Sequence, residues 1–241
     1  MMDRNAEWND DAILDVLRRH LSDQRPVTLL NTYQGIPVAY EADVAMVHTA
    51  VVGLIAHPYQ TACIKQARVT YIQSREIPAL VQAHPVSIDY TNRVVMVDQL
   101  RIPQSITSDL YRSLISPAEV VRVALDSDMG GLLEGTLVSL ATLEENTIRL
   151  VVDAPATAPF DRQDDVHLTF KLPDNGDLVQ VGGVVTTVND HHTEDRKRLI
   201  VEGQAAMQDE ISVLAYIARQ EDAVMNKLDQ VYKALRHGKI N

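Results

Sequence analysis

The sequence predicts a mainly β protein: two small antiparallel β-barrels in tandem, with a short N-terminal helix and a long C-terminal helix. Three observations favour this fold class. Two long blocks consist of short runs rich in Val, Ile, Thr and Tyr, which Gly, Pro or Asn interrupt about every ten residues. No helical pattern of about 10–15 residues separates those runs, which disfavours alternating strands and helices. Apolar residues recur at helical spacing only at the two ends of the chain.

At 241 residues the chain is long enough for two small domains, each with its own core. Aromatic residues make up only 5 % of it, so aliphatic side chains must build those cores. A polar stretch bracketed by prolines separates the two blocks. We therefore expect an N-terminal helix in 1–24, a β-barrel domain in 25–103, a linker in 104–118, a second barrel in 119–206 and a C-terminal helix in 207–241.

The N-terminal helix is expected over residues 10–21. Asn9 or Asp10 can cap it, because a short side-chain oxygen accepts the free amide hydrogens of the first turn. Pro26 ends it. In the block that follows, runs such as VTLL, IPVAY, AVVGLIA, TACIKQA and RVVMVDQL are interpreted as strands, and His57-Pro58 as a turn between two of them.

The clearest strand of the second block is DDVHLTFKL, in which apolar and polar residues alternate. Val166, Leu168, Phe170 and Leu172 should face the core. Turn-forming residues then separate LVQVGGVVTTV from RLIVEGQ, as in hairpins. The Gly182-Gly183 pair inside a strand suggests a bulge or a sharp bend that helps to close a small barrel.

The last helix is expected from Glu210 to about Arg236, where Gly238 stops it. Its apolar residues form a stripe wider than a two-stranded coiled-coil seam. We expect this stripe to make the protein a homo-oligomer, because a solvated apolar ridge is unfavourable. The alternative is a helix folded back across one barrel or the domain cleft. The residues assigned to oligomerisation are Leu214, Ile217, Val224, Met225, Leu228, Val231, Tyr232 and Leu235.

The charge balance restricts the partners. The chain carries 22 Lys and Arg against 33 Asp and Glu, a formal net charge of −11. Such a chain repels phosphate backbones and anionic lipid, so we expect no nucleic-acid binding. No apolar run approaches the roughly 20 residues needed to span a bilayer, so we expect no membrane insertion. The acidic start MMDRNAEWNDD does not fit a signal peptide, and Cys63 is the only cysteine, which excludes an internal disulfide. A cytoplasmic location is expected.

No catalytic constellation is visible. The phosphate-binding, dinucleotide-binding and serine-hydrolase motifs are all missing. His191-His192 lies among acidic residues, but adjacent strand residues point to opposite faces, so a solvated hairpin tip is favoured over a metal site. The other histidines are isolated, and Cys63 is expected to be a buried, inert thiol. We expect a protein that is not an enzyme and uses no cofactor or metal. An enzyme with an unrecognised site is the third-ranked alternative.

The order of these segments resembles the flagellar-brake class of bacterial PilZ-domain proteins, which bind cyclic di-GMP. In the first block the resemblance rests on VTLLNTYQGIPVAYEADV and on VVMVDQL. In the second block VVRVAL, GTLVSL, TIRLVV, DDVHLTFKLP, GGVVTTV, RLIVEGQ and the helix beginning DEISVLAYIARQED follow in the family's order. The resemblance implies a regulatory protein with two barrels, whose partners belong to motility or pilus machinery.

The resemblance also locates the nucleotide site, and there the sequence departs from the family. Family members use two arginines four residues apart before the first strand of the second barrel. Arg122 matches the second, but Ala118 stands at the first, and Arg112 lies ten residues upstream. The small polar signature Asp-x-Ser-x-x-Gly is replaced by Thr142, Glu144 and Thr147, and Glu144 adds a repulsive charge.

Two functions are therefore carried forward. The first is a non-enzymatic PilZ-like regulatory or adaptor protein in motility or surface-behaviour signalling, which acts through protein–protein contacts and has lost the usual nucleotide site. The second is a cyclic di-GMP receptor with a diverged site, in which Arg112 and Arg122 would hold the ligand. The first function implies that cyclic di-GMP binds weakly or not at all. The second function requires that it binds.

Overall fold

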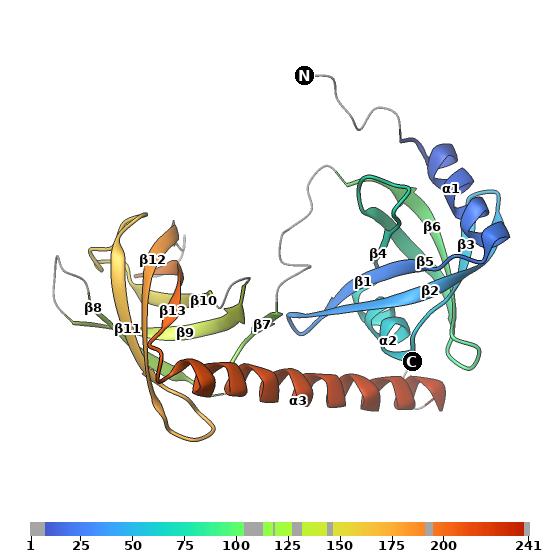
Figure 1. Ribbon diagram of the computed structural model, residues 1–241. Coiled ribbons are helices and arrows are strands. Elements are labelled where there is room, and N and C mark those ends of the chain that lie inside the picture. Colours follow the sequence, from blue (N-terminus) through green and yellow to red (C-terminus); the bar gives the residue numbers. More distant parts are fainter. Residues whose placement is uncertain are drawn as a thin grey trace. The chain divides into compact units, whose positions relative to one another are not determined.

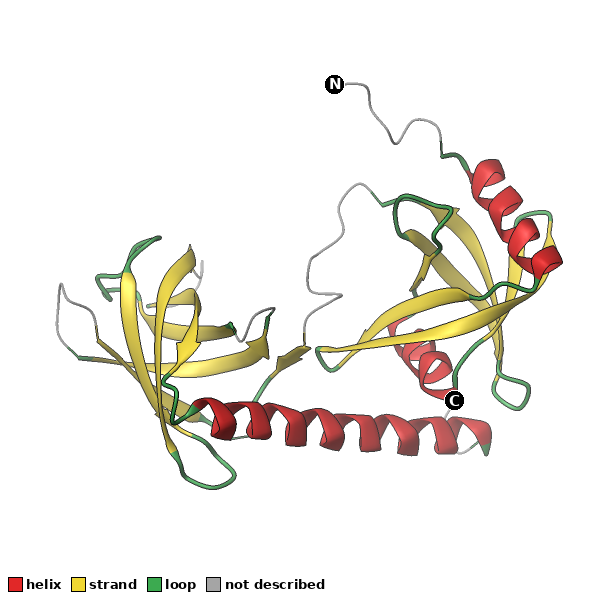
Figure 2. Cartoon of the chain, viewed as in Figure 1, coloured by secondary structure: helices red, strands yellow, loops and turns green. Residues whose placement is uncertain are grey.

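The chain forms two compact units, of which the first comprises Met1–Tyr111 together with Val224–Asn241 and the second Arg112–Ala223. A computed structural model describes residues 8–103, 113–117, 119–126, 132–143, 147–190 and 195–238. Strands dominate both units, and the described helices are α1, α2 and α3 (Figures 1 and 2). None of these helices combines the length and apolarity needed to cross a bilayer.

The first unit contains a closed barrel of six antiparallel strands in the order β1-β2-β3-β6-β5-β4. Aliphatic side chains fill it, as the low aromatic content requires. Ile13, Leu14 and Leu17 of α1 join the same core, so the helix covers part of the barrel. The strands are β1 (Val27–Tyr33), β2 (Ile36–His48), β3 (Val51–Ile55), β4 (Thr70–Gln73), β5 (Val81–Asp89) and β6 (Val94–Arg101).

Helix α1 spans Asp10–Asp23, close to the expected range. The Asn9 side chain accepts a hydrogen bond of 3.0 Å from the Ala12 amide, which confirms Asn9 as the N-cap. At the other end Gln24 adopts a left-handed conformation, and its amide donates to backbone carbonyls of the last turn. The predicted cap is confirmed, and the predicted position of the helix is confirmed to within two residues at its C-terminal end.

The interpretation of TACIKQA as a strand is wrong, because these residues belong to helix α2 (Pro58–Ala67). Pro58 lies in the first turn of the helix, where its missing N–H costs nothing, and the His57 side chain caps the Tyr59 amide. Residues 60–64 are all buried, including Gln60, which donates 2.6 Å to the Asn31 side chain on β1. A helix buried in this way shows no amphipathic period, so the sequence did not distinguish it from a buried strand.

The second unit contains another closed barrel of six antiparallel strands, in the order β10-β13-β12-β11-β8-β9, with the β9–β10 pairing closing the ring. The fold class predicted from the sequence is thereby confirmed. In β11, Val166, Leu168 and Phe170 face the core as the alternation predicted. The strands are β8 (Val121–Asp126), β9 (Leu133–Thr142), β10 (Ile148–Pro155), β11 (Asp165–Lys171), β12 (Leu178–Asp190) and β13 (Arg196–Ala205).

A further short strand, β7 (Ser113–Ile115), lies within the stretch expected to be a linker and pairs with the end of β9. Residues 104–112 and 118 of that stretch lie outside the described residues. The proposed boundary of 104–118 stays a prediction.

The predicted bulge at Gly182-Gly183 is not where the pairing breaks. Both glycines keep a regular register with β11 and β13, and the irregularity lies between Val185 and Thr187. The glycines instead allow a close backbone approach, because Gly183 lies directly opposite Gly203. A side chain at either position would collide with the backbone of the other strand.

Helix α3 spans Glu210–Arg236, and Gly238 follows with a φ of +65°, as predicted. Val213, Tyr216 and Ile217 belong to the core of the second barrel. Leu228, Tyr232 and Leu235 belong to a cluster in the first unit that also contains Tyr33, Ala62 and Cys63. The first half of α3 is therefore part of the second unit and its second half is part of the first.

This packing corrects the argument for oligomerisation. The apolar ridge that was expected to need another chain is covered by the chain's own barrels, as in the alternative of a helix folded back. Leu228 is 0 % exposed, Tyr232 is 8 % exposed and Leu235 is 7 % exposed within the single chain. Of the remaining assigned residues, Ile217 is buried, and Leu214, Val224, Met225 and Val231 are partly buried. The buried part of the stripe therefore does not require a second chain, and self-association through this helix stays a prediction.

Candidate functional site

Of the two arginines predicted to hold a ligand, Arg122 is among the described residues and Arg112 is not. Arg122 lies on β8, opposite Thr136 of β9, and its side chain is exposed. Lys171 of β11 lines the same open cavity of about 480 Å³. Because Phe170 pairs with Val123, Lys171 is the cross-strand neighbour of Arg122. Two cations therefore meet on the outer face of the second barrel.

The charge of this cavity is balanced. Glu119 and Glu134 line it together with Arg122 and Lys171, so two carboxylates offset the two cations. Ala124 follows Arg122 by two positions, so both point to the same face of β8. Glu134 of β9 pairs with Ala124, and its carboxylate therefore lies on the face that carries Arg122. No described residue forms an ion pair or hydrogen bond with the Arg122 guanidinium. Among the described residues, the site therefore offers one guanidinium without a partner, and the charges of its lining sum to zero.

The two described signature positions, Thr142 and Thr147, do not meet Arg122. Thr142 ends β9, and the Leu143 amide donates 2.7 Å to the carbonyl of Thr147 in the turn before β10. From Thr136, opposite Arg122, to Thr142 is six positions along β9, about 20 Å at strand spacing. Arg112, Ala118 and Glu144 lie outside the described residues. The described part of the predicted site is thus one arginine rather than a clamp.

The isolated histidine and the cysteine have structural roles, as expected. His57 caps α2, and its ring stacks on Tyr40 with the centroids 3.7 Å apart. Burial and the nearby Arg93 lower its pKa, so the neutral ring is favoured. Cys63 is 1 % exposed, and burial raises the pKa of its thiol to about 12. His191 and His192 lie outside the described residues, among which no group of His, Cys, Asp and Glu could hold a metal.

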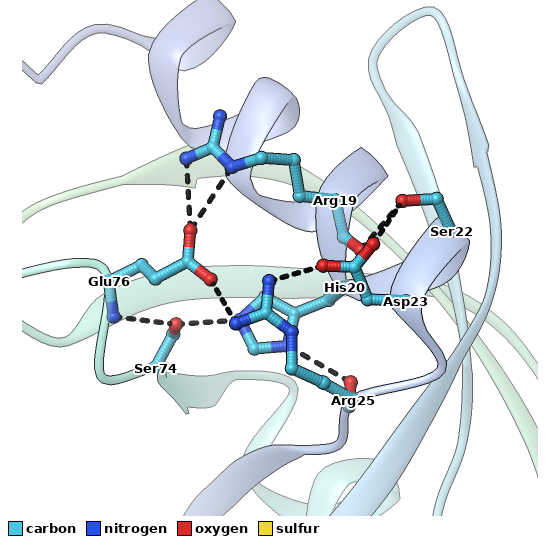
Figure 3. A network of polar contacts seen from close by, with 7 residues as sticks. All are labelled: Arg19, His20, Ser22, Asp23, Arg25, Ser74 and Glu76. Atoms are coloured by element: carbon cyan, nitrogen blue, oxygen red, sulfur yellow. Dashed lines mark hydrogen bonds and ion pairs between the residues drawn. The ribbon is translucent and has the colours of Figure 1, made fainter.

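A polar network that the sequence did not reveal connects α1 to the loop after β4 (Figure 3). His20 is 6 % exposed; its Nδ1 donates 2.9 Å to the Arg25 carbonyl, and its Nε2 lies 2.8 Å from the Ser74 hydroxyl. Glu76 binds Arg19 on one side and Arg25 on the other, at 3.0 and 2.8 Å. His20 and Ser74 are 54 positions apart in the chain, so no local pattern could have paired them.

The distance between His20 and Ser74 is that expected between a catalytic base and a nucleophile, but the surrounding contacts indicate a structural role. The Nδ1 of His20 is bound by a backbone carbonyl and not by a carboxylate that would stabilise a charged ring. The Ser74 hydroxyl also accepts a hydrogen bond from the Glu76 amide, which fixes the loop. The His20–Ser74 contact and the Arg19–Glu76 ion pair join the end of α1 to the loop after β4, and this is the role that we assign to the network.

Replacing Glu76 with glutamine is expected to lower the melting temperature by about 1–3 °C at pH 7, because both ion pairs are exposed. The hydrogen bond from Arg19, and then the charge of Arg25, lower the pKa of Glu76 below its usual 4.5. A carboxylate whose pKa is lowered in the folded state stabilises it above the unfolded pKa and loses this effect as the pH falls. Melting curves from pH 7 to pH 3 should therefore converge for wild type and Glu76→Gln.

The matched control for this experiment is Glu41→Gln, since Glu41 and Glu76 line one cavity beside Arg25 and Glu41 forms no ion pair with a described residue. It should leave the pH dependence of the wild type unchanged. A constant difference between wild type and Glu76→Gln down to pH 3 would contradict the assigned role of the ion pairs.

Comparison with known proteins gives matches only among solved structures. No protein-family model matches the chain, and no curated protein does so either. The structure of YcgR from Escherichia coli in complex with c-di-GMP is 13 % identical, with a TM-score of 0.42, over 96 % of this chain and 99 % of that one. The Bacillus subtilis inhibitor of motility, MotI/DgrA, is 10 % identical, with a TM-score of 0.40, over 81 % of this chain and 95 % of that one.

The K. pneumonia MrkH–c-di-GMP complex is 11 % identical, with a TM-score of 0.40, over 91 % of this chain and 97 % of that one. At these identities and scores the similarity carries no argument about the ligand or partner of this chain. The function proposed below rests on the chain's own residues.

Proposed function

We propose that the chain is a non-enzymatic regulatory or adaptor protein of the PilZ-like, two-barrel layout, which acts in the cytoplasm through protein–protein contacts in motility or surface-behaviour signalling. The observation that carries the proposal is the charge balance around Arg122. Fold alone does not establish function, but the family resemblance implies that a nucleotide would bind at the surface around Arg122. That surface is open, and the carboxylates of Glu119 and Glu134 offset its cations.

The electrostatic argument is direct. Cyclic di-GMP carries two phosphates, and tight binding of two negative charges requires bidentate guanidinium contacts in a site with positive potential. Arg122 supplies one fork. Lys171 supplies a point charge without the fork geometry, and each carboxylate of the lining repels the ligand. The described surface therefore favours weak or absent nucleotide binding and leaves protein contacts as the means of action.

One observation favours the second candidate function, a cyclic di-GMP receptor with a diverged site. The Arg122 guanidinium has no partner among the described residues, and Lys171 lies beside it. An unpaired arginine next to a lysine is a suitable contact for a phosphate. In this case the ligand would approach the outer face of β8 and β11.

Titration with cyclic di-GMP distinguishes the two functions. We expect calorimetry to find no binding tighter than about 10 μM, since only one guanidinium fork is available. Arg122→Ala should then change nothing. Submicromolar binding to the wild type that is lost in Arg122→Ala, and retained in the control Arg162→Ala on the same unit, would overturn the proposal in favour of the receptor.

A further inference from the structure

A cavity of about 300 Å³ lies between the end of α2 and strand β5 in the first unit. Lys65 and Arg68 line it from the helix, and both side chains are exposed. The opposite wall consists of Pro85, Val86, Ser87, Ile88 and Tyr90. The cavity is separate from the surface around Arg122, which belongs to the other unit.

The charge of this cavity is opposite in sign to that of the chain. Its lining contains two cations and no carboxylate, although the chain as a whole carries −11. The cavity at Arg25 contains Glu41 and Glu76, and that at Arg122 contains Glu119 and Glu134. Within the described part of the chain, no hydrogen bond or ion pair occupies the Lys65 or Arg68 side chain. Both cations are therefore available to an acidic ligand.

The helix end accounts for only part of this arrangement. Cations are favoured near a helix C-terminus, where the backbone carbonyls carry partial negative charge, and Lys65 and Arg68 satisfy that preference. The same carbonyls disfavour a small bare anion close to the backbone. A carboxylate on a side chain can instead reach the two cations from outside. Side-chain carboxylates of a partner can therefore pair with Lys65 and Arg68 without contacting the helix backbone.

The wall formed by β5 is apolar and has an open edge. Strand β5 pairs with β6 along one edge and with β4 along the other. The pairing with β4 ends at Thr70 and Ala83, so no described strand pairs with the β4 edge of residues 84–89. Val86 is the extra residue of a bulge between Pro85 and Ser87, and it is 58 % exposed. A strand edge with unpaired backbone groups can add an extended segment, and an exposed Val offers it an apolar contact.

We propose that this cavity binds an extended acidic segment of a partner protein, with glutamate or aspartate side chains paired to Lys65 and Arg68 and an apolar side chain packed on Val86. The inference rests on the proposed function, because it names the kind of partner that such an adaptor contacts. Charge complementarity selects the occupant. Two cations beside an apolar strand edge fit an acidic peptide, whereas nucleic acid is bound by an extended row of cations.

The probe for the test is a fluorescein-labelled peptide of sequence DEEVEIED, followed by fluorescence anisotropy with the full-length protein in 50 mM NaCl. We expect binding with a Kd of about 100 μM or tighter, which weakens as salt is raised because the contact is charged. The double variant Lys65→Glu, Arg68→Glu should weaken binding at least tenfold. The peptide DEESESED, which keeps the charges but replaces both apolar residues, should bind at least threefold more weakly.

The matched control is the double variant Arg162→Glu, Lys227→Glu, which changes the net charge by the same amount at two other exposed positions. It should bind the peptide within twofold of wild type. Equal weakening in both double variants would show that net charge alone drives binding and would overturn the site. A short DNA oligonucleotide bound more tightly than the peptide, with the same dependence on Lys65 and Arg68, would overturn the choice of partner.

Failure here is distinguishable from failure of the proposed function. If DEEVEIED does not bind the wild type, the cavity is not a docking site for acidic segments, whatever the cyclic di-GMP titration shows. If the nucleotide binds tightly through Arg122, the proposed function fails, whether or not the peptide binds at Lys65 and Arg68.

Discussion

Gly203→Ala is expected to destabilise the second barrel by about 3 kcal/mol or more, enough to unfold a marginally stable domain. A Cβ atom at position 203 would lie 2.2 Å from the Gly182 carbonyl oxygen and 2.6 Å from the Gly183 Cα. Both are backbone atoms of the neighbouring strand β12, so no side-chain rotation relieves the collision. Strands β12 and β13 would have to separate at this point. Thermal denaturation followed by circular dichroism measures the loss.

Gly182→Ala is the control for this prediction, since it adds the same methyl group one position from the close approach. Its Cβ would meet only the His167 ring, at 3.6 Å, which is an ordinary contact. A strand interior favours alanine slightly over glycine, so stability should stay the same or rise. A Gly203→Ala protein that melts within a few degrees of Gly182→Ala would show that β12 and β13 are further apart than described here.

Leu228→Ala is expected to release the second half of α3 from the first unit. Leu228 is 0 % exposed in the cluster that contains Cys63, Tyr33 and Tyr232. Truncating a buried leucine costs about 2–5 kcal/mol, and only a few other side chains hold this part of the helix. The Tyr232 hydroxyl donates the one hydrogen bond described between the helix end and the barrel, 3.2 Å to the Tyr90 carbonyl.

The single cysteine reports this release directly. In the wild type Cys63 is 1 % exposed, and burial keeps its thiol protonated, so reagents that require the thiolate should react slowly. In Leu228→Ala, and in a chain that ends after Asp222, we expect labelling by a disulfide reagent to accelerate at least tenfold. Lys227→Ala, an exposed neighbour on the same helix, should label at the wild-type rate.

The molar mass in solution of the chain that ends after Asp222 tests whether the apolar stripe of α3 packs on the chain's own barrels. If α3 packs on its own barrels, removing its second half uncovers apolar surface and should increase self-association. A full-length oligomer that becomes monomeric on truncation would instead restore the original expectation that the helix joins separate chains. Light scattering on both proteins gives the answer.

The elements that the sequence predicted correctly are those whose signals are local. Asn9 and Gly238 define helix ends because a cap acts within a few residues of itself. The alternation in β11 has the period of a strand with one buried face, so the inward residues follow from the chain alone. The two tandem barrels follow from the repetition of such runs in two blocks separated by a polar stretch.

The candidate site was only partly predictable for the same reason. Arg122 was identifiable because it stands beside a recognisable strand, and its exposure follows from the alternation in β8. Its neighbours Lys171 and Glu134 come from other strands, and only the register of β8 with β11 and β9 brings them to the same face. The charge of a surface that several strands share depends on their pairing, which short-range patterns do not specify.

The sequence by itself thus determined the helix ends, the strand periodicity, the absence of disulfides and the acidic net charge, because each depends on composition or on neighbours along the chain. Only the tertiary structure decided that 58–67 is a helix, that Leu228 packs on the chain's own barrel, and that Lys65 and Arg68 lie against the open edge of β5. An apolar stripe must be buried, but what buries it depends on contacts between residues far apart in the sequence. Those contacts exist only once the barrels have closed, because closure brings the distant segments together.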